Sequence, residues 1–162
     1  MRINNRRIKP IIKFIYTLIL LGLLASVLFS VLEINFLKII PIWGFAVLAI
    51  AILLIIYLRG DQLFEYDSDG EALNFRTQDA FWGDVFPNTK KSSEFPKEKL
   101  VSYQITGFFL RRTLCLTIKS KRSQSGFSKL KYNITYLNSQ ERRDLRKSLK
   151  KVVEDNKAKG LI

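Results

Sequence analysis

The chain contains no histidine and only one cysteine among its 162 residues. The side chain that most often serves as general base or metal ligand near neutral pH is therefore missing. The single thiol, Cys115, excludes an intrachain disulfide, and we interpret it as a packing residue of a strand. The sequence also has no glycine-rich phosphate loop and no metal-ligand spacing. We therefore expect no catalytic residue, no metal and no cofactor, and we predict that the protein is not an enzyme.

Charge is absent from two long stretches in the N-terminal third of the chain. Residues 14–32 and 39–58 contain no charged side chain. As a helix, each stretch is long enough to cross the hydrocarbon core of a bilayer, which is roughly 30 Å thick. The first stretch is longer than the apolar part of a typical signal peptide. Because only residues 33–38 separate them, we predict an antiparallel transmembrane hairpin over residues 14–58.

The distribution of charge around these stretches predicts their orientation. Residues 1–13 carry five basic side chains and no acidic one, whereas the connection 33–38 carries one of each. Cytoplasmic segments of membrane proteins are enriched in Lys and Arg. We therefore predict a basic cytoplasmic N-terminus (1–13), a multi-pass membrane protein, and both termini in the cytoplasm.

Small residues recur along both predicted spans. Such residues allow helix backbones to approach closely in lipid, where no hydrophobic force drives helices together. They either pack the hairpin on itself or contact a helix of another protein. The predicted helix-packing residues are Gly22, Ser26 and Ser30 in the first span, and Gly44 and Ala49 in the second.

Residues 59–162 have the patterns of a small cytoplasmic α+β domain. Asp69 and Gly70 form a strong hairpin signal between two short alternating segments. Apolar residues alternate with polar ones over 114–118 and again over 130–136, which is typical of half-buried strands.

The C-terminal part of this domain has the pattern of an amphipathic helix. Asn138 and Glu141 have the spacing of a capping box. Leu145, Leu149 and Val152 follow at helical spacing and form one apolar stripe. We predict a helix over residues 139–156.

Several short strands followed by one amphipathic helix is the element order of the pleckstrin-homology-like (PH-like) fold. The chain resembles bacterial membrane proteins in which two transmembrane helices precede a PH-like domain. The resemblance lies in residues 64–71 (FEYDSDGE), 95–101 (FPKEKLV) and 137–142 (LNSQER). It implies a small bent β-barrel of about seven antiparallel strands capped by the helix. It also implies a bacterial inner (plasma) membrane and a scaffold-like role, with no catalytic residue to transfer.

One feature departs from the lipid-binding members of the PH-like fold. Eukaryotic members bind inositol phosphates through a basic loop between their first two strands. In this chain the corresponding turn, residues 67–71, is acidic. The resemblance therefore does not extend to an inositol-phosphate site.

Positive charge concentrates in the last third of the chain. Residues 103–162 contain 15 basic and 4 acidic side chains. This surface is either simply solvated, or it binds anionic phospholipid headgroups, or it binds an acidic protein or RNA. Aromatic residues are not interleaved with the basic ones, so we do not expect a nucleic-acid partner. The predicted basic binding surface comprises Arg111, Arg112, Lys119, Lys121, Arg122, Lys129, Lys131, Arg142, Arg146 and Lys150.

These patterns support two hypotheses about function. The first is a non-enzymatic inner-membrane scaffold or accessory subunit of a larger bacterial membrane protein complex. It would dock through the helical hairpin and the basic domain. The alternative is a membrane regulator that senses anionic lipid.

Overall fold

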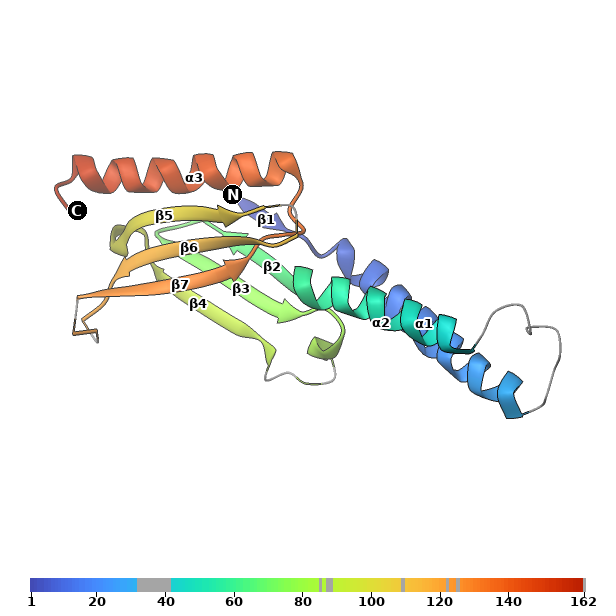
Figure 1. Ribbon diagram of the computed structural model, residues 1–162. Coiled ribbons are helices and arrows are strands. Elements are labelled where there is room, and N and C mark those ends of the chain that lie inside the picture. The colour runs from blue at the N-terminus through green and yellow to red at the C-terminus, as the bar shows by residue number, and fades with distance from the viewer. Residues whose placement is uncertain are drawn as a thin grey trace.

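The computed structural model describes residues 1–31, 42–84, 86, 89–108, 110–121, 123–124 and 126–161, without the side chains of residues 29, 30, 42, 43 and 45. Two long helices lie side by side and project from a β domain, which a third helix covers (Figure 1). The helices are α1 (Ile8–Val31), α2 (Ile42–Arg59) and α3 (Ser139–Ala158). The strands are β1 (Arg2–Asn4), β2 (Gln62–Asp67), β3 (Ala72–Asp79), β4 (Lys91–Pro96), β5 (Leu100–Gly107), β6 (Arg112–Lys119) and β7 (Phe127–Asn133).

The strands form two antiparallel sheets. One has the order β1-β2-β3-β4 and the other the order β5-β6-β7. This confirms the prediction of an antiparallel β domain with a C-terminal helix, but the two sheets do not close into the expected barrel. Pro96, which has no N–H to donate, ends β4, and the 3-10 turn η4 (Lys97–Lys99) then redirects the chain into β5. Among the described residues, no ladder joins β4 to β5.

The first strand of the β domain precedes the two long helices in the sequence, whereas the other strands follow them. Strand β1 pairs antiparallel with β2, with Ile3 opposite Tyr66. The side chain of Ile3 is 5% exposed and belongs to the main hydrophobic core. Residues 2–4, which the sequence places in a separate basic N-terminus, are thus part of the β domain.

The core of the β domain is built from aromatic rings between the sheets. Phe75 stacks against both Phe95 and Tyr132, with ring centroids 5.7 and 5.0 Å apart. From the other side, α3 contributes Leu145 and Leu149, both fully buried. Such a core supplies most of the stability of a small domain, because burial of apolar area contributes about 25 cal/mol per Å².

Local sequence signals account for the ends of two elements. Asn138 caps α3: its Oδ1 accepts from the Glu141 N–H at 2.6 Å, and Glu141 Oε2 accepts from the Asn138 N–H at 2.7 Å. This confirms the predicted capping box. The turn between β2 and β3 contains Gly70 with a φ of 73°, a conformation that glycine adopts readily.

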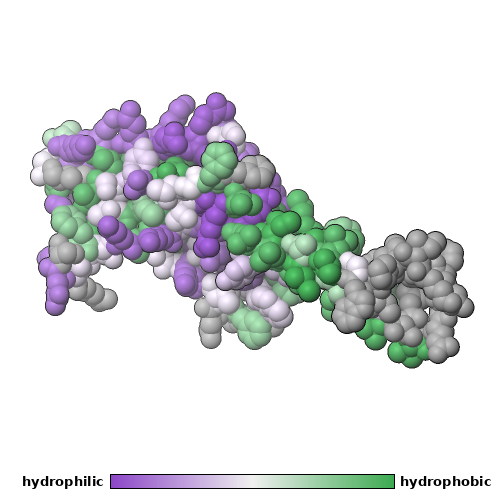
Figure 2. Space-filling model, in the orientation of Figure 1, coloured by the Kyte–Doolittle hydropathy of each residue, from purple (hydrophilic) through white to green (hydrophobic). Residues whose placement is uncertain are grey.

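Helix α1 is long and apolar enough to cross a membrane over Ile8–Leu28. Among the described residues it is the one helix that meets this criterion, because the apolar helix Ala46–Arg59 is shorter. The predicted connection 33–38 and the start of the predicted second span at residue 39 lie outside the described residues. Figure 2 shows hydrophobic side chains gathered over the two helices and hydrophilic ones over the β domain.

Candidate functional site: the junction of the long helices and the β domain

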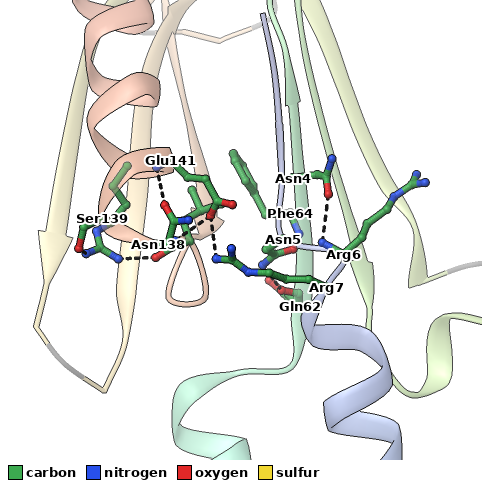
Figure 3. Close-up of polar contacts among 11 residues, drawn as sticks. Asn4, Asn5, Arg6, Arg7, Gln62, Phe64, Asn138, Ser139 and Glu141 are labelled. Atoms are coloured by element: carbon green, nitrogen blue, oxygen red, sulfur yellow. Dashed lines mark hydrogen bonds and ion pairs between the residues drawn. The ribbon is translucent and has the colours of Figure 1, made fainter.

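The segment that joins β1 to α1 is held against β2 by a buried asparagine. Asn5 is fully buried; its Oδ1 accepts from the Phe64 N–H at 2.7 Å, and its own N–H donates to the Phe64 carbonyl oxygen at 3.1 Å. Asn5 therefore acts as one more residue of the sheet immediately before the helix begins. Figure 3 shows Asn5 close to Phe64 and Gln62 at the base of α1.

A buried carboxylate joins the same segment to β2. Glu65 is 8% exposed and accepts from Arg2 Nε at 2.8 Å and from Arg6 Nη2 at 2.9 Å. Burial alone would raise the pKa of Glu65, but the hydrogen bonds and positive charges of the two guanidinium groups outweigh it and lower the pKa below its ordinary value. Glu65 is therefore ionised near neutral pH and fixes both ends of the N-terminal segment.

Two further contacts hold the long helices against the domain. Arg7 Nη2 lies 3.2 Å from Glu141 Oε2, which links the start of α1 to the start of α3 (Figure 3). The Asn133 side chain at the end of β7 donates to the Arg59 carbonyl oxygen at 2.9 Å, which holds the end of α2. Gly60 follows with a φ of 72°, and a Cβ there would lie 2.3 Å from Asn133 Nδ2.

Residues 81–84, between β3 and β4, lie against the first turns of α1. It contains a 3-10 turn, η2 (Trp82–Asp84). The Asp84 carboxylate accepts a hydrogen bond from Lys9 Nζ at 2.7 Å and another from Lys13 Nζ at 2.6 Å. Hydrogen bonds from Lys13 and then Lys9 lower the pKa of Asp84 to about 2. The rings of Tyr16 and Phe81 meet with centroids 4.4 Å apart.

An open pocket of about 390 Å³ lies on the sheet beside this junction. Its one acidic lining residue is Glu65. The basic lining residues are Arg6 before α1, Arg76 on β3, Lys90 just before β4 and Lys91 on β4. Within the described part of the chain, no acidic side chain lies within ion-pair distance of Arg76, Lys90 or Lys91. Such a pocket can hold an anion of the size of a phosphate group through charge-assisted hydrogen bonds.

Comparisons with known protein families, curated proteins and solved structures find no match to this chain.

The predicted basic binding surface is spread over the domain rather than gathered at one place. Arg112 and Arg142 lie close together near the start of α3; burial, and then the charge of Arg112, lower the pKa of Arg142. Lys119 and Lys121 lie at the β6–β7 connection, at the end of the domain remote from α1 and α2 (Figure 1). Arg122 lies outside the described residues. The other positions are exposed or half-exposed on the β6 start, on β7 and on α3, namely Arg111, Lys129, Lys131, Arg146 and Lys150.

The predicted helix-packing residues do not all occupy one environment. Ala49 is buried between the helices at 8% exposure. Gly22 is exposed, and a Cβ at this position would meet no atom within 4 Å. Ser26 is half-buried, with its hydroxyl donating to the Leu23 carbonyl oxygen, and Gly44 is exposed. The side chain of Ser30 lies outside the described part.

The junction contains residues that sequence reasoning did not select. Asn5 lies in a run of polar residues and bonds to Phe64 of β2, and Glu65 lies opposite Arg76 of β3. No short motif marks these residues, because their contacts depend on the pairing of strands. Among the described residues, no group of three potential metal ligands is close enough to hold a metal ion. Cys115 lies half-buried on β6.

Proposed function

We propose that this chain is a non-enzymatic scaffold or accessory subunit of a bacterial inner-membrane protein complex, anchored by α1 and α2 as a transmembrane hairpin. The observation that carries the anchoring is the pairing of β1 with β2. These strands flank the two helices in the sequence, so both ends of the helical segment lie on one side of the membrane. If α1 crosses the bilayer, the chain must cross back before Gln62. Residues 39–58, which are uncharged, are the stretch suited to this return.

The orientation of this hairpin follows from charge. Five basic residues precede residue 14, and the positive-inside bias favours their cytoplasmic location. Because β1 pairs with β2, the β domain lies on the same side as the N-terminus, and we propose that this side, with both termini, is the cytoplasm. This supports a multi-pass protein whose folded domain lies directly against the inner leaflet.

We further propose that the domain is a variant of the PH-like fold. A four-stranded and a three-stranded antiparallel sheet followed by a C-terminal helix support this interpretation. In this variant the first strand precedes the transmembrane helices, and the remaining strands follow them. The domain would then be tied to the membrane at both ends of a single β-ladder.

The surface of the long helices supports docking to another membrane protein. The small residues of α1 (Gly22, Ser26 and Ser30) form the small-residue stripe. A Cβ at Gly22 would meet no atom within 4 Å, so α2 does not cover the stripe at this position. A partner helix could approach the α1 backbone closely at this point. Such a contact would supply the membrane part of a scaffold interface, while the exposed basic face of α3 supplies the cytoplasmic part.

A purification experiment tests this function. The full chain, solubilised in a mild detergent, should retain a membrane protein partner. Gly22→Leu should release that partner because its side chain fills the approach surface. Ala51→Leu, at an exposed α2 position outside the stripe, should retain it. If no protein co-purifies with the wild type, or if both variants retain the partner, the proposed docking through the small-residue stripe is wrong.

The pocket beside the junction favours a second candidate, a regulator that senses anionic lipid. Its four basic residues lie on the end of the sheet next to the helices, where a phospholipid headgroup is within reach. In vesicles, anionic lipid should then raise the melting temperature of the wild-type chain. Arg76→Gln together with Lys91→Gln should lose this increase, and Lys147→Gln on α3 should keep it. An increase that is unchanged in the double variant would contradict binding in this pocket.

A further inference from the structure

An aromatic patch formed by Phe81, Trp82 and Phe86 lies next to the base of α1. The ring centroids of Phe81 and Trp82 are 4.9 Å apart, and those of Trp82 and Phe86 are 5.7 Å apart. Trp82 is 48% exposed and Phe86 is 53% exposed. Large aromatic side chains that remain this exposed next to one another point to a surface that contacts something apolar.

The position of the patch along α1 is fixed by three contacts. Asp84 is bound by Lys9 and Lys13, and the ring of Phe81 contacts that of Tyr16. Residues 14–32 carry no charge, so Lys13 is the last charged residue before the apolar part of α1. The aromatic patch therefore lies at the level where α1 changes from charged to apolar. In a membrane-spanning helix, this level is the boundary between headgroups and acyl chains.

We propose that Trp82 and Phe86 insert into the interfacial layer of the bilayer, on the side that carries the β domain. The inference rests on the proposed membrane hairpin, because α1 sets the depth of the patch. The occupant of the aromatic surface is lipid, since Phe81 joins the patch to Tyr16 in the uncharged part of α1. Trp is enriched at this depth because its ring is apolar while its N–H still reaches water or headgroups.

The charges around the patch are compatible with this insertion. A lone carboxylate at the interface would be repelled by anionic headgroups, but Asp84 is paired with two lysines, so the local group carries a net positive charge. The low pKa of Asp84 agrees with this pairing. The patch is thus an apolar surface with a net positive charge beside it. An anionic leaflet attracts this combination.

Insertion of the patch would give the domain a third attachment to the bilayer besides α1 and α2. Two helices that lie side by side still allow the hairpin, together with the domain attached to it, to tilt in the bilayer. An additional contact through the β3–β4 segment removes this freedom. It also brings Lys90 and Lys91, which lie at the start of β4 and line the pocket, toward the headgroups.

Tryptophan fluorescence of the full chain in vesicles tests the proposal. In a Trp43→Phe background, Trp82 is the sole tryptophan. Its emission maximum should lie at a shorter wavelength than that of tryptophan in water. Lipids brominated near the headgroup should quench this emission more strongly than lipids brominated near the acyl-chain ends. Emission typical of water, with no quenching by either lipid, would overturn the proposal.

Two further tryptophan positions separate this inference from the hairpin itself. In a background of Trp43→Phe and Trp82→Phe, Leu24→Trp reports on the middle of α1 and should be quenched most by the deep bromines. Gln124→Trp reports on the remote end of the domain and should not be quenched by either lipid. Quenching at position 24 without quenching of Trp82 would leave the hairpin intact and refute the aromatic contact. No quenching at position 24 would refute both.

Discussion

Glu65 is one of the residues that bind the N-terminal segment to the sheet. Its carboxylate accepts from two guanidinium groups, one on β1 and one just before α1. Because the pKa of Glu65 in the folded chain is lowered from 4.5, its ionised form stabilises the fold at pH values above about 4.5. This stabilisation is lost as the pH falls through the lowered pKa.

Glu65→Gln should therefore destabilise the chain near neutral pH but not in acid. We expect a loss of about 1–2 kcal/mol near neutral pH, since two charge-assisted hydrogen bonds with partly exposed partners are weakened. The difference from wild type should shrink as the pH falls below the ordinary range of glutamate, where wild-type Glu65 becomes protonated. Thermal melts of both proteins in detergent across this pH range measure the difference. A gap that stays constant with pH would contradict the assigned role.

Asn156 is a second residue whose role depends on distant partners. It is 3% exposed, and its Nδ2 donates to the carbonyl oxygens of Lys97 and Leu100, each at 2.8 Å. These bonds attach the last turns of α3 to the turn between the two sheets. The local pattern suggested only that the helix ends near this position, whereas the helix continues to Ala158.

Asn156→Ala should lower the free energy of unfolding by about 1–3 kcal/mol, because buried carbonyl oxygens lose their donor. Asp155→Ala is the matched control, since it makes a similar change at the neighbouring exposed position of the same helix. Chemical unfolding followed by circular dichroism measures both. Equal stability of the two variants would show that the Asn156 bonds contribute nothing net.

At the scale of elements, those whose sequence signal lies within the element itself could be predicted. The capping box at Asn138 and the stripe through Leu145 and Leu149 predicted α3, because both signals lie within one helix. The Asp69-Gly70 pair predicted the β2–β3 hairpin for the same reason. Strand β1 was not predicted, because three residues are too few to show the alternation of apolar and polar side chains that is typical of a strand. The expected barrel closure was wrong because it depends on how β4 and β5 are oriented, which no local pattern specifies.

Strand β1 should be necessary for the stability of the domain. Ile3→Asp should destabilise it strongly, by about 3 kcal/mol or more, because it places a charge in the core between the sheets. Asn4→Asp introduces the same charge at the adjacent exposed position and should melt within a degree or two of wild type. Similar melting of the two variants would mean that β1 does not pack into the core.

At the scale of the whole molecule, the candidate site could be predicted only in part. The sequence located the apolar stretches and the surplus of basic residues, which are properties of composition. It did not locate the junction, because Arg6, Glu65 and Arg76 come together through pairing between strands that two helices separate in the chain. The pocket depends on the same pairing, since it combines Arg6 with side chains of β2, β3 and β4. The aromatic patch lies between β3 and β4 and depends on contacts of that segment with α1.

The central claim is that α1 and α2 cross the membrane and return the chain to the side on which β1 pairs with β2. Single cysteines at Arg7, Asn35 and Glu98, in a Cys115→Ser background, test it most directly. A membrane-impermeant maleimide added to intact cells should label position 35 alone. Positions 7 and 98 should react only after permeabilisation, and always together. Identical labelling of positions 35 and 98 would show that the helices do not cross, and opposite labelling of positions 7 and 98 would contradict the pairing itself.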